Sequence, residues 1–358
     1  MIGVIPAAGR ASRMGQIRVP KALIEVDGRT LLERSIETLR RVGVSRIIVV
    51  VGHLGEKIVE HKLDVEIAYQ EQPLGLAHAI ATANPDDDFV VLCPDNVYTD
   101  HTDLIRAREV LDSHAFVLLG TVTPNTQRDR KSYFTSARRN LAPNVYDYQS
   151  NNENTEGLVI NSTGCVFFKR EALDWLPSFS NREHIFRDYL ESIIQHREAL
   201  IYLLRGMRYD FSTPEDIDQY VELKRRLGEA KGPQGVSAIL INPQGQVLLQ
   251  QRDDNPAIRY PAHWSLFGGT IEDGESPAEA IAREVHEEID FELRNFGLFR
   301  EFVQNNKREF AFAGELTAGL DELTLREGQG MNFFYPSQLR GLQIRPDDKE
   351  TLEQYFGA

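Results

Sequence analysis

Cysteine is scarce in this chain of 358 residues, which contains Cys93, Cys165 and no others. Two cysteines are too few for a disulfide framework, and they fit a reducing compartment. Both stand in apolar stretches, so we expect them to pack in the core without reacting.

Long apolar runs and a basic surplus are also missing. The longest aliphatic runs, such as residues 47–51, are far too short to cross a bilayer. The first residues carry no basic segment ahead of an apolar core, as a secretion leader would. The formal charge of −14 argues against nonspecific binding of nucleic acid, whose backbone is also negative. The sequence therefore predicts a cytoplasmic protein without nucleic-acid or membrane partners, and leaves a homo-oligomer open.

Repeats, heptads and low-complexity tracts are absent as well, and the composition, 41% hydrophobic and 26% charged, is that of a globular protein. A chain of this length has two domains by default. Glycine, proline and polar residues gather in the segment GEAKGPQG, residues 228–235. We predict a first domain over residues 1–228, a linker over 229–234 and a second domain over 235–358.

The first domain opens with a short apolar strand that runs into a loop of small residues, IGVIPAAGRASRMG. Thr30 and Glu33 then form a capping-box pattern at the start of a helix that ends near Gly43. The segment from Arg46 to Val51 reads as a buried parallel strand. Strand, helix and strand in this order predict a doubly wound α/β sheet with ligands at the carboxyl ends of its strands.

The second domain begins with two predicted strands joined by an Asn-Pro-Gln-Gly turn, in GVSAILINPQGQVLLQQRDD. A helix should follow from Ser276, a good N-cap, with Pro277 in the first turn and Glu279 closing a capping box. Its inward stripe should be apolar and comprise Ala278, Ile281, Ala282, Val285 and Ile289.

Three carboxylates share another face of this helix. Glu284, Glu287 and Glu288 recur at i, i+3 and i+4 and therefore project together. An ordinary acidic surface is one interpretation, because like charges one turn apart cost only about 0.2–0.5 kcal/mol per pair. A site for a divalent cation is the other, since Mg²⁺ prefers hard oxygen ligands.

The surrounding segment, GTIEDGESPAEAIAREVHEEIDF, resembles the Nudix box at every position but one. Asp290 stands where that family has glycine, although aspartate tolerates the left-handed conformation better than most residues. The resemblance implies an α/β/α sandwich and hydrolysis of a nucleoside diphosphate linked to another group. It also implies that Arg283 orients the carboxylates and is itself oriented by Glu275. The implied ligands of Mg²⁺, or alternatively Mn²⁺, are Gly268 through its carbonyl, Glu284, Glu287, Glu288 and, more weakly, Glu327. Glu284 and Glu287 are also the catalytic candidates, although the identity of the base stays open.

Residues 1–220 resemble the sugar-1-phosphate nucleotidyltransferases, and glucose-1-phosphate thymidylyltransferases in particular. Four motifs in family order carry this resemblance: AAGRASRMG with the nearby VPK, YQEQPLGLAHAI, VVLCPDN and RYDFSTPEDI. A Rossmann-like mixed sheet is the implied fold. Ala11 and Ser12 depart mildly from the family's glycine and threonine, and the usual Glu-Lys-Pro segment is missing. Lys131, Arg138 and Arg139 are unassigned candidates for its phosphate-binding lysine.

The same resemblance assigns roles in this first domain. Arg13 would grip the departing pyrophosphate and Lys21 would contact phosphate. Asp95, at the end of a predicted strand, and Asp210 would hold Mg²⁺. The implied substrate-binding residues are Ala8, Gly9, Gln70, Gly75, Asn96 and Gly164, with Gln70 bonding the nucleobase edge.

Taken together, the two resemblances predict a bifunctional enzyme. One half would use a nucleoside triphosphate and a sugar 1-phosphate, and the other a nucleoside diphosphate derivative. Two alternatives remain open: a cytidylyltransferase that acts on an alcohol phosphate, and a nucleotide-sugar sensor that regulates the Nudix half. Trp264, Phe267 and Phe333 either line the Nudix subsite or fill core.

Overall fold

The computed structural model describes most of the chain as two compact units, one over most of residues 1–219 and one over residues 220–358 with the short segment Arg205–Met207. The predicted linker is short in the structure, because a long helix ends at Glu229 and the next strand begins at Gly235. The described residues are 1–9, 14, 19–72, 74–111, 114–122, 134–137, 140–142, 145–147, 158–176 and 186–356.

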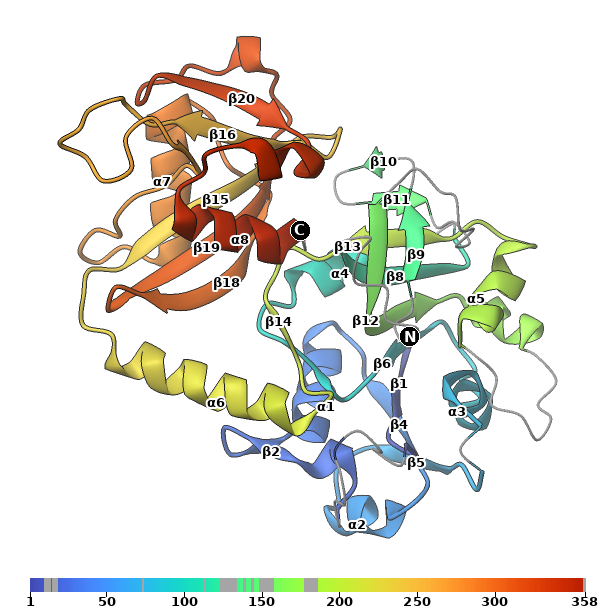
Figure 1. Cartoon of the computed structure of the whole chain (residues 1–358). Helices are drawn as coiled ribbons and strands as arrows, with labels where there is room; N and C mark the ends of the chain where they lie inside the picture. Colours follow the sequence, from blue (N-terminus) through green and yellow to red (C-terminus); the bar gives the residue numbers. More distant parts are fainter. Residues whose placement is uncertain are drawn as a thin grey trace. The chain divides into compact units, whose positions relative to one another are not determined.

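The first unit is built on one mixed sheet (Figure 1). Ten strands of the described residues form it in the order β10-β11-β13-β8-β12-β6-β1-β4-β5, with β9 paired to β12. Strands β6, β1, β4 and β5 are mutually parallel, and β12 runs antiparallel to β6. The predicted doubly wound mixed sheet is therefore confirmed. The strands are β1 (Ile2–Pro6), β4 (Arg46–Val51), β5 (Glu66–Tyr69), β6 (Phe89–Leu92), β8 (Phe116–Val122), β9 (Phe134–Ala137), β10 (Asn140–Ala142), β11 (Val145–Asp147), β12 (Leu158–Phe168) and β13 (Leu200–Leu203).

Helices cover both faces of this sheet. On one face, Leu32 of α1 (Leu31–Arg41) and Leu104 of α4 (Thr102–Glu109) share a core cluster with alternate residues of β1, β4 and β6. On the other face, Phe168 stacks on Phe89 and on Tyr189 of α5 (Phe186–Ile194), which contacts α3 (Leu76–Ala83). The remaining short elements of this unit are η2 (Lys21–Leu23), β2 (Glu25–Val26), β3 (Arg29–Thr30), α2 (Gly55–Glu60), β7 (Asn96–Tyr98), η3 (Arg170–Trp175) and β14 (Arg208–Asp210).

The helix predicted from Thr30 is present with its capping box, because Thr30 accepts from the Glu33 amide and the Glu33 carboxylate accepts from the Thr30 amide. The strand predicted to end at Asp95 is shorter than expected. It ends at Leu92, and Asp95 lies in the turn that follows.

The second unit is a sandwich around a smaller sheet (Figure 1). Six strands are ordered β17-β16-β15-β19-β18, with β20 paired to β16. Alternate residues of β16 explain the two helical layers: Leu248 packs with α7 (Pro277–Ile289), whereas Val247 and Leu249 pack with α8 (Pro346–Phe356). The predicted α/β/α sandwich is thus confirmed. The other elements are α6 (Pro214–Glu229), β15 (Gly235–Ile241), β16 (Val247–Gln251), β17 (Trp264–Ser265), β18 (Phe296–Gln304), β19 (Lys307–Glu315), η4 (Leu320–Glu322), β20 (Gly330–Phe334) and η5 (Pro336–Gly341).

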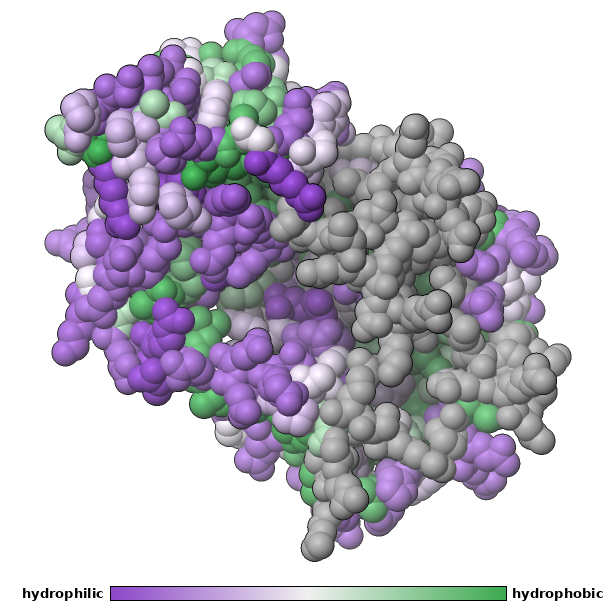
Figure 2. All heavy atoms as spheres, in the orientation of Figure 1, coloured by the Kyte–Doolittle hydropathy of each residue, from purple (hydrophilic) through white to green (hydrophobic). Residues whose placement is uncertain are grey.

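Apolar side chains on the surface are scattered. On the face drawn in Figure 2, hydrophilic residues predominate over the described parts of both units. No helix among the described residues combines the length and the apolar character that a membrane span needs. The large apolar side chains that are exposed lie far apart in the sequence: Val19, Val59, Tyr69, Ile105, Val221, Leu320 and Tyr335.

Candidate active sites

The first candidate site lies where the parallel strands of the large sheet end. The Nζ atom of Lys21 donates to Oδ2 of Asp95 at 2.7 Å, although 74 residues separate them. Strand β14 pairs with β7 so that Asp210 stands opposite Asn96, and the Phe211 amide donates to the Asp95 carbonyl at 2.8 Å. The structure therefore brings together the lysine and both aspartates that the sequence singled out.

The two cysteines lie in surroundings that disfavour the thiolate. Burial raises the pKa of Cys93, and the negative charges of Asp95 and Asp210 raise it further. Burial also raises the pKa of Cys165. Neither thiol is therefore set up as a nucleophile, as the sequence predicted.

Asn96 and Gly164 support the two aspartates. The Asn96 amide donates to Oδ1 of Asp95 at 2.8 Å, and its carbonyl oxygen accepts from Arg208. Gly164 has a φ of +73°, and a Cβ at this position would lie 2.6 Å from Nδ2 of Asn96. Glycine is therefore required where β12 passes the site. Sequence reasoning missed Arg208, which also contacts Asp210 at 3.4 Å; its position two residues before Asp210 in a strand places both on one face.

Gln70 lies at the end of β5 beside the small-residue loop. Gly52 is packed so closely here that a Cβ would lie 2.9 Å from Cβ of Ala8 and 3.1 Å from the carbonyl of Gln70. The Gln70 side chain is buried, and its amide nitrogen lies 3.3 Å from the Gly75 carbonyl and 2.8 Å from Nδ1 of His78. Since a carbonyl only accepts, the atom facing Gly75 is the donating nitrogen. His78 was not predicted, although it follows Gln70 by eight residues in the same segment.

Of the remaining predicted residues of the first domain, the structure describes two and leaves out four basic ones. Ala8 is buried and Gly9 exposed directly after β1. Arg13, Lys131, Arg138 and Arg139 lie outside the described residues, and their roles stay predictions.

The second candidate site is on α7, which begins as predicted. Ser276 accepts from the Glu279 amide, and Glu279 accepts from the Ser276 amide. Asp290 ends the helix in the left-handed conformation with a φ of 57°, so aspartate replaces glycine here without a change of backbone. The prediction that Ala278 packs inward is wrong: Ala278 lies exposed in the first turn of α7, and Ala280, next to Ile281, is buried in the core instead.

Arg283 links three glutamates by hydrogen bonds of 2.9 to 3.1 Å. Its Nε and Nη2 donate to the two oxygens of Glu275, at 2.9 and 3.0 Å. Its Nη1 donates to Glu284 at 2.9 Å and to Glu287 at 3.1 Å. The ion pairs predicted for Arg283 are therefore present, and they fix where two of the glutamates point.

The three glutamates share a face of α7 but differ in exposure. The side chain of Glu287 is 59% exposed and that of Glu284 is 15% exposed, whereas Glu288 is 6% exposed as a residue. Glu288 accepts from the Gly268 amide at 3.0 Å and from Nε2 of Gln250 at 3.4 Å. Burial, followed by the charges of Glu327 and Glu284, raises the pKa of Glu288 to about 8.

This shift predicts a pH-dependent stability. Between pH 4.5, its unfolded value, and about 8, Glu288 holds a proton only in the folded chain, so the free energy of unfolding should fall as pH rises. The total loss is at most about 5 kcal/mol, because one pKa unit corresponds to about 1.4 kcal/mol. Denaturant unfolding of the metal-free protein between pH 5 and 9 measures it, and Glu288→Gln should flatten the profile. Equal slopes for both proteins would contradict this origin.

A divalent cation fits the chemistry of this site. Within the parts of the chain that the structure describes, no three acidic, histidine or cysteine side chains converge into a metal-binding cluster. Arg283 and the Gly268 amide occupy their oxygens instead. The carboxylates are nevertheless close together, since Glu284 and Glu287 share Nη1 of Arg283, and Glu288 and Glu327 line the same pocket. These carboxylates supply several hard oxygen ligands, and only Arg283 lies among them to offset their charge. Mg²⁺ or Mn²⁺ would bind such oxygens and neutralise the remaining negative charge.

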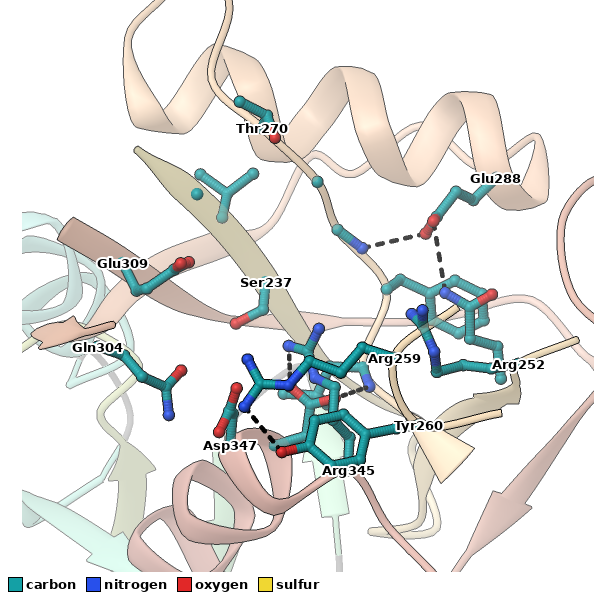
Figure 3. A pocket seen from close by; sticks show the side chains of 18 of the residues that line it. Ser237, Arg252, Arg259, Tyr260, Thr270, Glu288, Gln304, Glu309, Arg345 and Asp347 are labelled. Carbon is teal, nitrogen blue, oxygen red and sulfur yellow. Dashed lines mark hydrogen bonds and ion pairs between the residues drawn. The ribbon is translucent and has the colours of Figure 1, made fainter. Parts of the chain in front are cut away.

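These carboxylates border a pocket of about 860 Å³. Figure 3 shows Glu288 at one side of it, with Arg252, Arg259, Tyr260 and Arg345 below. Gly268 and Glu327 also line it, as their predicted roles require. Sequence reasoning missed Gln250, which lies on β16, and Arg252, which directly follows that strand; both line the pocket. Of the three aromatic residues left open, Phe267 is fully buried, and Trp264 and Phe333 pack against the core clusters.

Comparison with known families separates the two units. Residues 3–166 match the family model of the MobA-like NTP transferase domain, and residues 231–355 match that of the NUDIX domain. The chain joins an NTP transferase domain to a NUDIX domain.

Curated relatives include sugar-phosphate nucleotidyltransferases. The low-salt glycan biosynthesis nucleotidyltransferase Agl11 of Haloferax volcanii is 30% identical, over 61% of this chain and 64% of its own length. The UTP–glucose-1-phosphate uridylyltransferase AglF of the same organism is 32% identical, over 33% of this chain and 54% of its own. The bifunctional protein GlmU of Paraburkholderia phymatum is 31% identical, over 54% and 43%. This chain thus spans less than two thirds of each of these relatives.

Solved structures support the fold of the NTP transferase domain. UDP-glucose pyrophosphorylase of Acinetobacter baumannii superposes with a TM-score of 0.52 at 21% identity, over 64% of this chain and 95% of that one. A UDP-glucose pyrophosphorylase complexed with UDP-glucose gives a TM-score of 0.54 at 17% identity, over 62% and 98%.

Proposed function

We propose that the NTP transferase domain transfers a nucleotidyl group from a nucleoside triphosphate to a sugar 1-phosphate and releases pyrophosphate. The observation that carries this proposal is the meeting of Lys21, Asp95 and Asp210 at the carboxyl edge of the parallel strands. The ammonium group of Lys21 can contact a phosphate, and the two aspartates can hold a divalent cation, so the site can neutralise the charge of two reacting phosphates. The names of the relatives, a glucose-1-phosphate uridylyltransferase among them, agree with it.

The residues act by positioning and by neutralising charge. The sugar phosphate oxygen attacks the α-phosphorus, the bond to the β-phosphate oxygen breaks, and pyrophosphate leaves. No protein nucleophile is needed. Lys21 contacts phosphate, and Arg13 is proposed to grip the pyrophosphate. Asp95 and Asp210 would hold Mg²⁺, which would offset the charge of the reacting phosphates.

Gln70 favours uridine or thymidine nucleotides. Its amide nitrogen is already engaged by Gly75 and His78. Its carbonyl oxygen is left to accept from the base, and the imino N–H of uracil or thymine donates there. Cytosine presents an unprotonated ring nitrogen at the equivalent position, which would face an acceptor with an acceptor.

The NUDIX domain, in the same proposal, hydrolyses a nucleoside diphosphate linked to another group. Glu284, Glu287, Glu288, Glu327 and the Gly268 carbonyl would hold the Mg²⁺ or Mn²⁺ that polarises the phosphate and activates water. Arg283 positions Glu284 and Glu287. This face of α7 has three glutamates and one arginine, and Glu288 is buried, whereas the carboxylates of an ordinary acidic surface are exposed to water. The burial supports a metal site.

A panel assay tests both halves. The full chain with Mg²⁺ is incubated with each nucleoside triphosphate and with sugar 1-phosphates, and pyrophosphate is followed. We expect turnover with UTP or dTTP and a sugar 1-phosphate. Turnover only with CTP and an alcohol phosphate would show instead that the domain is a cytidylyltransferase. Tight binding without turnover would identify a sensor. Diphosphate substrates added alone test the NUDIX domain.

A further inference from the structure

One side of the NUDIX pocket is lined by four polar side chains, which we name the polar wall: Ser237, Gln304, Glu309 and Asp347. They come from β15, β18, β19 and α8, and so the fold gathers them from distant parts of the domain. In Figure 3, Glu309, Gln304 and Asp347 lie across the pocket from Glu288. The polar wall is therefore separate from the carboxylate face of α7.

The side chains of the polar wall are without partners among the described residues. All four are partly buried. Within the described residues, none of the four side chains forms a hydrogen bond or an ion pair, while Arg345 beside them pairs with Asp348 at 2.8 Å. The polar atoms of the four side chains are therefore open to the pocket and free to bond to a molecule in it. Four such groups that converge on one pocket indicate a bound molecule with several hydrogen-bonding groups.

Glu309 is held against the backbone. A Cβ on Gly235, the first residue of β15, would lie 2.2 Å from Oε2 of Glu309. The carboxylate thus occupies space that only glycine leaves open. Burial raises the pKa of Glu309, and the charge of Arg345 opposes this rise without a direct contact. The carboxylate is partly removed from water and available to accept hydrogen bonds.

The chemistry of the polar wall selects the class of ligand. Two carboxylates repel phosphate and accept hydrogen bonds, and the hydroxyl and the amide both donate and accept. The aromatic residues of the pocket give a flat base little to stack on. Phe267 is fully buried, Tyr260 has Arg259 over its ring at 4.8 Å, and Phe302 has Arg300 over its ring at 4.3 Å. A non-planar group with several hydroxyls fits best.

We propose that the polar wall binds the sugar of a nucleoside diphosphate sugar, and that this is the substrate class of the NUDIX domain. The proposal rests on the proposed hydrolase activity. Water adds its oxygen to one phosphorus, and the bridging oxygen leaves with the other phosphate. The proton of the attacking water passes to a base. The products are a nucleoside monophosphate and a sugar 1-phosphate.

The test compares two substrates of the full chain, UDP-glucose and UDP whose β-phosphate carries a methyl group instead of the sugar. Wild type should cleave UDP-glucose with the higher kcat/KM. Glu309→Gln and Asp347→Asn should each raise its KM about tenfold with little change in kcat, because a charged acceptor is replaced by a neutral amide. Cleavage of the methyl ester should be unchanged. Glu353→Gln, an exposed carboxylate on the same helix as Asp347, is the matched control.

The outcomes distinguish a failure of the sugar-binding inference from a failure of the proposed hydrolase activity. Equal losses on both substrates would give the polar wall a structural role only and overturn the inference. A wild type that cleaves the methyl ester as well as the nucleotide sugar would overturn it too, as would selectivity that follows the base across several UDP-, ADP- and GDP-sugars. A chain that cleaves no diphosphate at all would instead remove the proposed hydrolase. Unchanged cleavage of the methyl ester reports that the NUDIX domain of each variant is folded.

Discussion

Replacing Asp95 by asparagine is expected to reduce nucleotidyl transfer by about three orders of magnitude or more, while diphosphate hydrolysis by the same chain is unchanged. Asp95 pairs with Lys21 at 2.7 Å and lies beside Asp210. Asparagine has nearly the same shape, but it removes the charge that would hold a divalent cation and that orients the lysine. Reactions between phosphates depend on such charge neutralisation, so the loss should fall on kcat.

The experiment has an internal and an external control. Hydrolysis measured on the same preparation reports the integrity of the NUDIX domain. Asp64→Asn removes a fully exposed carboxylate that pairs with Arg40, and it should leave transfer at the wild-type rate. Transfer retained by Asp95→Asn would refute the assignment of this site.

Much of the fold could be predicted because its signals are local. The capping boxes at Thr30 and Ser276 depend on residues three apart, and both helices begin where the pattern placed them. The predicted approach of Asp210 to Asp95 required a resemblance, because the two are far apart in the sequence and spacing says nothing about the pairing of β14 with β7.

Other features of the sites depend on tertiary packing. Spacing alone makes Glu284, Glu287 and Glu288 equal, but the sheet covers only one edge of the carboxylate face and so buries Glu288 alone. The hydrogen bond from Gln250 to Glu288 and the contact of Arg208 with Asn96 cross between elements. No local pattern marks them, although alternation along each strand gives their direction.

The two proposed activities run in opposite directions, since one forms a diphosphate bond and the other breaks it. The sites read different parts of the substrate, however. Gln70 would read the base in the first domain, and the polar wall would read the sugar in the second. Hydrolysis of a nucleotide sugar would release a sugar 1-phosphate that the transferase accepts. A chain with both sites would therefore move a sugar from one base to another when the two domains differ in base selectivity, and would waste triphosphate when they do not.

Replacing Gly268 by alanine is expected to abolish hydrolysis and to destabilise the NUDIX domain. Gly268 has a φ of +142°, and a Cβ would lie 2.1 Å from the Val236 carbonyl oxygen and 2.8 Å from Cα of Ser237. Both contacts are with backbone, so the loop must move away from β15 and withdraw the Gly268 amide from Glu288. Overpacking and backbone strain together should cost about 3 kcal/mol or more.

Gly274→Ala separates these two causes. Gly274 lies in the same loop with a φ of +86° and has open space where a Cβ would be, so alanine there adds backbone strain of about 1 to 2 kcal/mol and no clash. Denaturant unfolding and diphosphate hydrolysis should both rank wild type above Gly274→Ala, and Gly274→Ala well above Gly268→Ala. Transfer by the first domain should be equal in all three, because its site shares no residue with this loop. Equal hydrolysis by the two variants would mean that the close contact with β15 does not hold the loop in place for the carboxylate face of α7.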